Sequence, residues 1–173
     1  MLGRLILLVG LMSFQTTARA VEMNVDIVAG TFNGQSLCDL SVEKVSDILG
    51  RPADTRMRRA GTDAYYYDQG LMFFFSKESV VGLTVYFAVQ KSAETGGAFK
   101  PYAGKFNQGI SGVWKLERFL EAFPEFTMEE DVKLEGKRLL LFKSKMTWLQ
   151  LEVETSSGVV VRLTYSRANL WWQ

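Results

Sequence analysis

Acid–base chemistry near neutral pH has few candidate residues in this chain. The 173 residues include no histidine and a single cysteine, Cys38, so the commonest general base and a cysteine–histidine nucleophile are both missing. No glycine-rich phosphate loop, paired-cysteine zinc motif or Gly-x-Ser-x-Gly turn occurs. We therefore expect a protein that is not an enzyme and that uses no cofactor and no metal. Catalysis by carboxylates alone would have to use Glu117, Glu121, Glu129, Glu130 and Asp131, which are more typical of a solvated helix face and a charged loop.

Two charged clusters of opposite sign could instead bind another protein. Four arginines lie between residues 51 and 59, namely Arg51, Arg56, Arg58 and Arg59, and Glu129, Glu130 and Asp131 lie in the corresponding segment of the second half of the chain. Arginine is well suited to gripping a carboxylate, and a desolvated charge can dominate an interface. We expect both segments to be loops. The alternative explanation of the charges is plain solvation, or attraction between the two loops.

Aromatic residues supply two further candidate anchors. Tyr65, Tyr66 and Tyr67 form a short predicted strand, and Trp171 and Trp172 follow Arg167 near the C-terminus. A strand with bulky groups on both faces is either buried on both sides or presents an exposed aromatic face. The two tryptophans either bind a partner or dock on the protein's own core. The predicted partner-binding residues are thus Arg56, Arg58, Arg59, Tyr65, Tyr66, Tyr67, Glu129, Glu130, Asp131, Trp171 and Trp172.

A repeated sequence indicates how these residues are positioned. Residues 29–34, Ala-Gly-Thr-Phe-Asn-Gly, return 74 residues later as Ala-Gly-Lys-Phe-Asn-Gln, and residues 80–85 are echoed 80 residues later at 160–165. Such a period is typical of a duplicated supersecondary unit, with the six extra residues as a loop insertion. We predict an α+β fold of two tandem repeats, each a short helix packed on a three- or four-stranded antiparallel meander. The repeats span residues 21–87 and 103–173, with a connector over residues 88–102.

Local patterns place similar elements in each repeat. In the first, an opening strand over residues 23–28 precedes a helix with an apolar stripe at Val42, Val45 and Leu49, capped by Ser41 and ended at Gly50 and Pro52. Three strands follow over residues 65–67, 71–75 and 80–87. In the second, Ser111 is the predicted cap of a helix that stops at Pro124, and strands follow over residues 138–142, 147–153 and 159–166. One short helix covers only part of a sheet face, so we expect the repeats to share surface.

The start of the chain resembles a secretory signal. Arg4 precedes the apolar run of residues 5–12, and Ala18-Arg19-Ala20 fits a cleavage site. A membrane-spanning helix is the alternative, but it needs about 20 apolar residues. We predict cleavage after Ala20 and a mature chain with 18 basic and 19 acidic residues, which favours neither nucleic acid nor stable membrane insertion. One cysteine forms no internal disulfide, and we expect Cys38 to be a small buried hydrophobe. The predicted location is the periplasm, with secretion into the medium as the alternative.

The predicted order of elements resembles two known families. A helix followed by a three-stranded antiparallel meander, present twice in an exported chain, resembles the tandem arrangement of beta-lactamase inhibitor proteins. The segment Ile48-Leu49-Gly50-Arg51-Pro52, followed by Tyr66-Tyr67-Asp68, is similar to the single-unit outer-membrane assembly lipoproteins of the SmpA/OmlA type. The chain departs from the lipoprotein pattern in having no cysteine directly after the predicted cleavage point. The resemblance implies a protein that occludes another protein or bridges envelope components.

Three functional hypotheses follow from these observations. The first is a periplasmic immunity or inhibitor protein whose loop or groove plugs the active site of a toxic effector enzyme, such as one delivered by type VI secretion. A structural module for envelope assembly that binds an outer-membrane or cell-wall component is the second. The third is a small-ligand binder that uses the aromatic sheet as a pocket wall. The sequence leaves the partner's identity, the oligomeric state and the joining of the two sheets undetermined.

Overall fold

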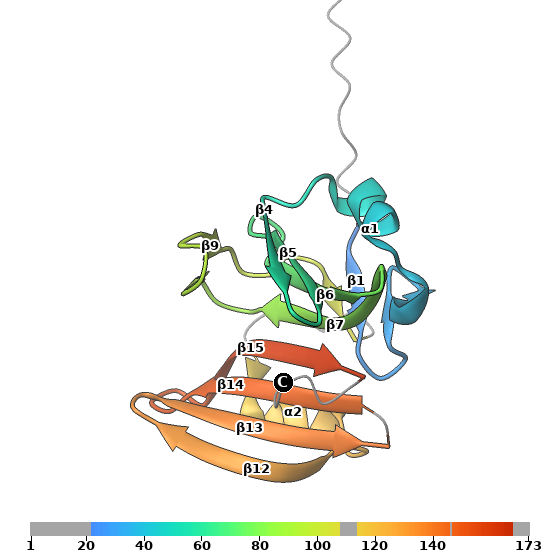
Figure 1. Cartoon of the computed structure of the whole chain (residues 1–173). Helices are drawn as coiled ribbons and strands as arrows, with labels where there is room; N and C mark the ends of the chain where they lie inside the picture. Colours follow the sequence, from blue (N-terminus) through green and yellow to red (C-terminus); the bar gives the residue numbers. More distant parts are fainter. Residues whose placement is uncertain (1–21, 108–113, 146, 168–173) are drawn as a thin grey trace, which may run out of the picture.

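One large antiparallel sheet runs through both halves of the chain (Figure 1). The computed structural model describes residues 22–107, 114–145 and 147–167. Along the sheet the strands follow the order β12-β13-β14-β15-β7-β6-β5-β4, and the short β11 pairs with the beginning of β15. The strands are β4 (Asp54–Arg58), β5 (Gly61–Tyr66), β6 (Leu71–Ser76), β7 (Ser79–Tyr86), β11 (Trp114–Lys115), β12 (Thr127–Leu134), β13 (Lys137–Ser144), β14 (Thr147–Glu154) and β15 (Val159–Ser166).

The predicted α+β fold of two tandem repeats, each a helix on a meander, is wrong. The residues that the structure describes are mostly β, and the two α-helices among them, α1 (Val42–Leu49) and α2 (Leu116–Ala122), are only eight and seven residues long. The last strands of the two predicted meanders are β7 and β15. They pair with each other, so the strands of both halves belong to one sheet. Both strands are mostly buried along their length, and an apolar strand left at an open edge would be prone to pair with another chain.

A local two-fold arrangement relates the two halves at the β7–β15 pair. Thr84 lies opposite Thr164, and their buried hydroxyl oxygens are 2.9 Å apart. Beyond each strand, the Phe87 N–H donates to the Val161 carbonyl at 2.9 Å, and the Arg167 N–H donates to the Val81 carbonyl at 3.2 Å. Each bond has its counterpart 80 residues away, so the second of the two sequence echoes lies at the junction between the halves.

The first sequence echo forms part of a small second sheet. Its strands follow the order β10 (Lys105–Phe106), β1 (Asn24–Asp26), β2 (Thr31–Phe32) and β3 (Gln35–Ser36). The side-chain oxygen of Asn33 accepts from the Asn24 N–H at 2.7 Å, and that of Asn107 accepts from the Ile27 N–H at 2.8 Å. Both asparagines have positive φ angles, 50° and 40°, which asparagine tolerates better than most residues. The two copies of the motif therefore hold one shared segment, β1 and the residue after it, from both sides.

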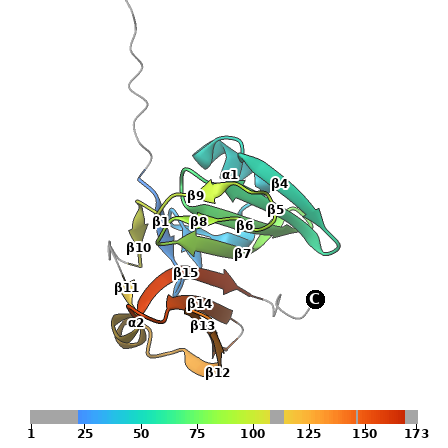
Figure 2. The ribbon, with the colours of Figure 1, turned by 90° about the vertical axis from the view of Figure 1, so that its left-hand side faces the viewer.

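Different elements pack on the two faces of the large sheet. The helix face packs against α1, α2 and the small sheet in one core that includes Val45, Phe73, Leu83, Phe119 and Phe142. The opposite face, here called the connector face, carries the segment 88–102 with its two short strands, β8 (Gln90–Lys91) and β9 (Ala98–Phe99). Figure 2 shows this hairpin in front of β5 and β6 of the first half, whereas Figure 1 shows α2 behind the strands of the second half.

The two segments predicted to be charged loops are strands. The arginines Arg56 and Arg58 belong to β4, and Glu129, Glu130 and Asp131 belong to β12. These strands are the two edges of the large sheet, and β12 is exposed along its whole length. An edge strand turns charged side chains to solvent, so its composition is similar to that of a loop.

The two helices begin in different ways. Ser41 caps α1 as predicted, because its hydroxyl accepts from the Lys44 N–H at 3.2 Å, and Gly50 follows the helix with a φ of 82°. Lys115 occupies the cap position of α2 and makes no side-chain cap bond, while Ser111 lies outside the described residues. Within the described part of the chain, no helix is long and apolar enough to cross a bilayer.

The hydroxyl pair at the junction gives a first test of the fold. We expect Thr84→Val to lower the free energy of unfolding by about 1–2 kcal/mol, because it leaves the buried Thr164 hydroxyl without its partner. The double change Thr84→Val with Thr164→Val should recover most of that loss, since neither hydroxyl then remains. Urea denaturation of both single variants and the double variant measures this coupling. Additive losses would show that the two hydroxyls do not depend on each other.

Candidate functional site

The connector closes over the first half through aromatic stacking. Phe99 stacks on Tyr86 with ring centroids 3.7 Å apart and planes 11° apart, and its ring centroid lies 4.8 Å from that of Tyr67. Tyr65, Met72, Tyr86 and Phe99 form a buried cluster. Burial raises the pKa of Tyr86 to about 12, so its hydroxyl stays protonated at neutral pH. The aromatic face that the sequence suggested as a pocket wall is thus filled by the protein's own chain.

The three predicted contact tyrosines do not form one surface. Tyr65 lies under the connector, and its hydroxyl donates to Glu94 at 2.8 Å. Tyr67 is on the same side and shares a hydrogen bond with Thr95. Tyr66 lies on the helix face, where its ring packs edge-on against Phe73 at 5.8 Å. Burial of both strand faces, one of the two interpretations of this segment, describes Tyr65 and Tyr66.

The arginines of β4 grip carboxylates of their own chain. Arg56 forms an ion pair with Glu94, a residue of the connector. Arg58 bridges Glu94, with Nη2 3.0 Å from Oε2, and the buried Asp63. Arg51 and Arg59 are exposed. Two of the predicted partner-binding arginines therefore hold the connector against the sheet edge.

The pKa values of the two carboxylates in this cluster, Asp63 and Glu94, are shifted in opposite directions. Burial raises the pKa of Asp63, and the hydrogen bond from Arg58 only partly opposes this. Burial also acts to raise the pKa of Glu94, but hydrogen bonds from Arg56 and Tyr65 and the charge of Arg58 outweigh it, so the pKa of Glu94 is lowered. Glu94 therefore remains ionised at neutral pH and keeps the cluster intact.

A second ionic cluster links the connector to the second half. Glu152 is 5% exposed, and its Oε2 lies 2.7 Å from Nη2 of Arg162. Its other oxygen accepts from Lys137 and from the side chain of Gln90 in β8, the latter at 3.2 Å. The connector is thus held at Gln90 and at Glu94 by carboxylate-centred contacts.

Strand register identifies which residues occupy equivalent places in the two halves. One row across the sheet runs Tyr65, Met72, Thr84, Thr164, Gln150 and Leu141. Counting outward from the threonine pair, Leu141 is the equivalent of Tyr65. The neighbouring rows make Val132 the equivalent of Arg56 and Leu139 the equivalent of Asp63. By the same register Leu134 takes the place of Arg58. Where the first half has an ionic cluster, the second half therefore has aliphatic side chains.

These aliphatic side chains form an apolar surface, here called the open face. Val132 is 44% exposed and Leu134 is 51% exposed, and Leu139, Leu141 and Trp148 are partly exposed. The ammonium of Lys143 lies 4.8 Å from the ring centroid of Trp148. In Figure 1 the strands β12 to β15 lie in front of α2, so the face of the sheet opposite α2 looks toward the viewer. Its members are Val132, Leu134, Leu139, Leu141 and Trp148.

The acidic residues of β12 divide between the two faces of the sheet. Glu130 lies opposite Leu141, on the connector face, while Asp131 lies opposite Leu140, on the helix face. A bulge between Met128 and Glu130 places Glu129 out of the regular pairing. The outer edge of this exposed strand therefore carries negative charge beside the open face.

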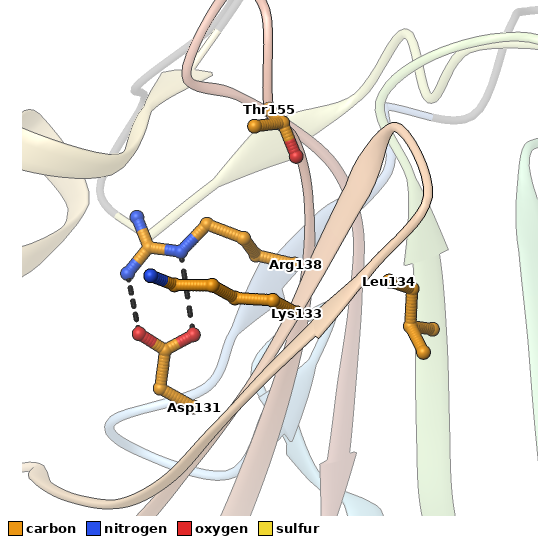
Figure 3. Close-up of a pocket in the computed structure, with 5 residues that line it drawn as sticks. All are labelled: Asp131, Lys133, Leu134, Arg138 and Thr155. Atoms are coloured by element: carbon orange, nitrogen blue, oxygen red, sulfur yellow. Dashed lines mark hydrogen bonds and ion pairs between the residues drawn. The ribbon is translucent and has the colours of Figure 1, made fainter.

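A shallow hollow lies on the helix face at the far end of β12 and β13. It has a volume of about 490 Å³ and is lined by Asp131, Lys133, Leu134, Arg138 and Thr155 (Figure 3). Nη2 of Arg138 donates to Asp131 at 2.7 Å, and this bond lowers the pKa of Asp131. A carboxylate held ionised in this way is a weak base at neutral pH, so the hollow offers a bound ion pair for contact with a partner.

Sequence reasoning missed several of the residues that define these surfaces. Glu94 lies in the segment interpreted as a plain connector. Asp63 lies at the end of a predicted loop, and Glu152 lies in a predicted strand. The alternation of Val132, Lys133 and Leu134 is typical of a strand and would have identified β12. Trp171 and Trp172 lie outside the described residues. Within residues 22–107, 114–145 and 147–167, no group of acidic, cysteine or histidine side chains is placed to hold a metal ion.

Comparisons with known proteins give only structural likenesses. No protein-family model matches the chain, and no curated protein matches it. Three solved structures are similar at TM-scores of 0.48, 0.46 and 0.46. They are a DUF4309 family protein from Bacillus subtilis, a cysteine-rich secretory protein from Staphylococcus aureus, and an extracellular protein with an SCP domain from Bacillus anthracis.

Identity to these proteins is low and coverage is uneven. Sequence identities are 8%, 12% and 16%, over 78%, 73% and 76% of this chain. The matches cover 82% of the first structure but 43% and 47% of the other two, so this chain spans less than half of their length. Likenesses this weak transfer no function, and the resemblance to beta-lactamase inhibitor proteins and SmpA/OmlA-type lipoproteins stays a prediction.

The connector cluster gives a test by mutation and pH. We expect Glu94→Gln to lower the free energy of unfolding at pH 7 by about 1 kcal/mol, because the cluster is partly exposed. Since the folded-state pKa of Glu94 is lowered, the contribution of Glu94 to the free energy of unfolding is fully present above the ordinary glutamate pKa. It is lost as the pH falls through the lowered value.

Denaturant unfolding at neutral and acidic pH measures the difference in stability between wild type and Glu94→Gln. The difference between them should shrink as the pH falls from about 5 to about 3. Glu135→Gln, in the exposed turn between β12 and β13, is the matched control and should change stability by less than about 0.5 kcal/mol. A difference between wild type and Glu94→Gln that stays constant with pH would refute the assignment.

Proposed function

We propose that this chain is an exported protein-binding protein whose partner adds an extended strand to β12. The observation that carries the proposal is the exposed eight-residue edge strand beside the apolar open face. An unpaired edge offers a row of backbone donors and acceptors, and strand addition is a common mode of peptide recognition. The adjoining apolar side chains would receive alternate side chains of the added strand.

The chemistry of β12 limits the kind of strand that fits it. Val132 and Leu134 favour apolar side chains on the connector face, and Glu129 and Glu130 favour basic side chains near the start of β12. The other edge strand, β4, is five residues long, and its arginines Arg56 and Arg58 are already engaged with Glu94. We therefore place the partner at the acidic edge of the sheet and not at the arginine edge.

Export rests on the first 20 residues, whose apolar core and Ala18-Arg19-Ala20 site resemble a cleaved signal. Within the class of exported binding proteins, we propose the immunity or inhibitor hypothesis first and envelope assembly second. The small-ligand hypothesis has less support, because Phe99 fills the aromatic face that would have lined the pocket. A partner enzyme that loses activity when the purified chain is added at equal concentration would support the immunity or inhibitor hypothesis. A partner that is an envelope component without enzymatic activity would support envelope assembly.

A pair of variants on the two sheet edges tests the binding surface. We expect Val132→Lys with Leu134→Lys to lower partner affinity at least tenfold, about 1.4 kcal/mol, because the added charges would be buried by an arriving strand. Affinity capture from periplasmic extract with the mature chain, followed by mass spectrometry and titration of the recovered protein, measures the loss.

The matched control places lysines on the other edge, at Thr55 and Met57. Both residues are exposed, and Met57 is 87% exposed, so Thr55→Lys with Met57→Lys should leave capture unchanged. Circular dichroism and thermal unfolding establish that both variants fold. Equal loss of the partner with both pairs, or with neither, would contradict binding at β12.

A further inference from the structure

We infer that β12 also pairs with β12 of a second copy of this chain, antiparallel and centred on Val132, to form a two-fold dimer. The inference concerns the same edge as the proposed partner but does not require that partner. An edge strand pairs with only one further strand, so the dimer and the complex with the partner exclude each other. The partner would therefore bind the monomer.

The regular part of this edge is short and well defined. The pairing of β12 with β13 is continuous from Glu130 to Leu134, and the bulge before Glu130 interrupts it. All of these residues are exposed. Because successive residues of a strand point to opposite faces, Glu130, Val132 and Leu134 lie on the connector face, and Asp131 and Lys133 lie on the helix face. An incoming strand thus meets a separate charge pattern on each face.

The charges of β12 select one register for self-pairing. In a continuous antiparallel sheet, directly opposite residues lie on the same face, so the two-fold axis between identical strands passes beside one residue. An axis at Glu130, Asp131 or Lys133 places that charge opposite its like, which is destabilising. An axis at Leu134, the last residue of β12, leaves most of the strand unpaired. An axis at Val132 places Asp131 opposite Lys133 of the second copy, and symmetry repeats this pair.

The helix face is prepared for these two ion pairs. Arg138 donates to Asp131 from Nη2 at 2.7 Å and from Nε at 3.3 Å. Figure 3 shows Asp131, Lys133 and Arg138 side by side. Within the described part of the chain, Asp131 is the carboxylate paired with Arg138, and Lys133 forms no ion pair. In the dimer each Asp131 would lie between its own Arg138 and Lys133 of the second copy.

The connector face gains an apolar row from the same register. Val132 lies opposite Leu139 within the chain, so one row across the joined sheet would run Leu139, Val132, Val132 and Leu139. Val132 is 44% exposed and Leu139 is partly exposed, and covering apolar surface in this way is favourable. The remaining pair, Glu130 opposite Leu134, adds no like charge.

The size of the interface makes the dimer weak and limits it to two copies. Pairing over five residues of each strand is small beside the roughly 800 Å² that each partner buries in a standard interface, and we expect a dissociation constant of about 0.1 mM. A two-fold contact uses the same edge of both copies and is therefore closed. At the opposite edge of the sheet, Arg56 and Arg58 are held by Glu94 of their own chain.

Charge exchange tests the register. In sedimentation equilibrium of the mature chain up to about 1 mM, we expect a monomer–dimer equilibrium. Asp131→Lys or Lys133→Asp alone should raise the dissociation constant at least about tenfold, because each places like charges opposite at two positions. An equimolar mixture of these two variants should form a heterodimer of wild-type strength, since every opposite pair is then of opposite charge. Lys91→Asp, at an exposed residue of β8, should change nothing.

Cysteine cross-linking tests the same register without altering a charge. In a chain with Cys38→Ala, Val132→Cys would bring two thiols together at the axis, where opposite Cα atoms are about 5 Å apart and a disulfide fits. Leu134→Cys is the matched control on the same face, at a 51% exposed residue. In this register its two copies are about 13 Å apart along the strand, beyond the reach of a disulfide. Val132→Cys should therefore form covalent dimers faster under mild oxidation. This arm keeps the test valid if Asp131→Lys does not fold.

Three outcomes would overturn the inference. One is a wild-type chain that stays monomeric at about 1 mM. Another is a mixture of folded charge variants that associates no better than either variant alone. The third is equal rates of cross-linking for Val132→Cys and Leu134→Cys. All of these measurements use the purified chain alone, so their failure leaves the proposed partner of β12 to be tested by the affinity capture described above.

Discussion

The pairing of β7 with β15 is the constraint on which the rest of the structure depends. It removes two apolar strand edges at once and joins the halves into one sheet through the register that centres on Thr84 and Thr164. Because antiparallel pairing of equivalent strands imposes a two-fold relation, it also puts both helices on the same side of the sheet. The helix face is therefore closed by a single core, and on the connector face the ionic cluster of the first half contrasts with the aliphatic side chains of the second.

Buried carboxylates explain how the connector stays on that face. Asp63 and Glu152 are each less than a tenth exposed, and each has cationic partners from neighbouring strands. A buried carboxylate without a partner would cost several kcal/mol, so these clusters form together with the covering segment. Glu94 and Gln90 bring the connector into the same clusters. Charge thus fixes the position of a segment whose buried aromatic side chain, Phe99, stacks on Tyr86.

The sequence could predict what depends on local patterns and not what depends on pairing. The Ser41 cap and the apolar stripe of α1 are local, and they were predictable because capping and helical spacing act within a few residues. The charged segments holding Arg56 and Glu130 looked like loops, since solvent-facing edge strands carry the same residue types. The joining of β7 to β15 depends on partners 80 residues apart. Likewise, Glu94 is unremarkable until the fold brings it to Arg56 and Arg58.

The size of the open face sets what it can contribute to binding. Full burial of a Val or Leu side chain is worth about 1.5–3 kcal/mol, and Val132 and Leu134 are already about half covered. Together they supply about 2 kcal/mol, far below the roughly 12 kcal/mol of a nanomolar complex. Tight binding at β12 therefore requires the backbone bonds of an added strand and a surface that extends beyond these two side chains. In the first half the equivalent positions, Arg56 and Arg58, hold the protein's own connector through ion pairs with Glu94. The same sheet geometry therefore binds a segment of the chain itself at one edge and presents Val132 and Leu134 to solvent at the other.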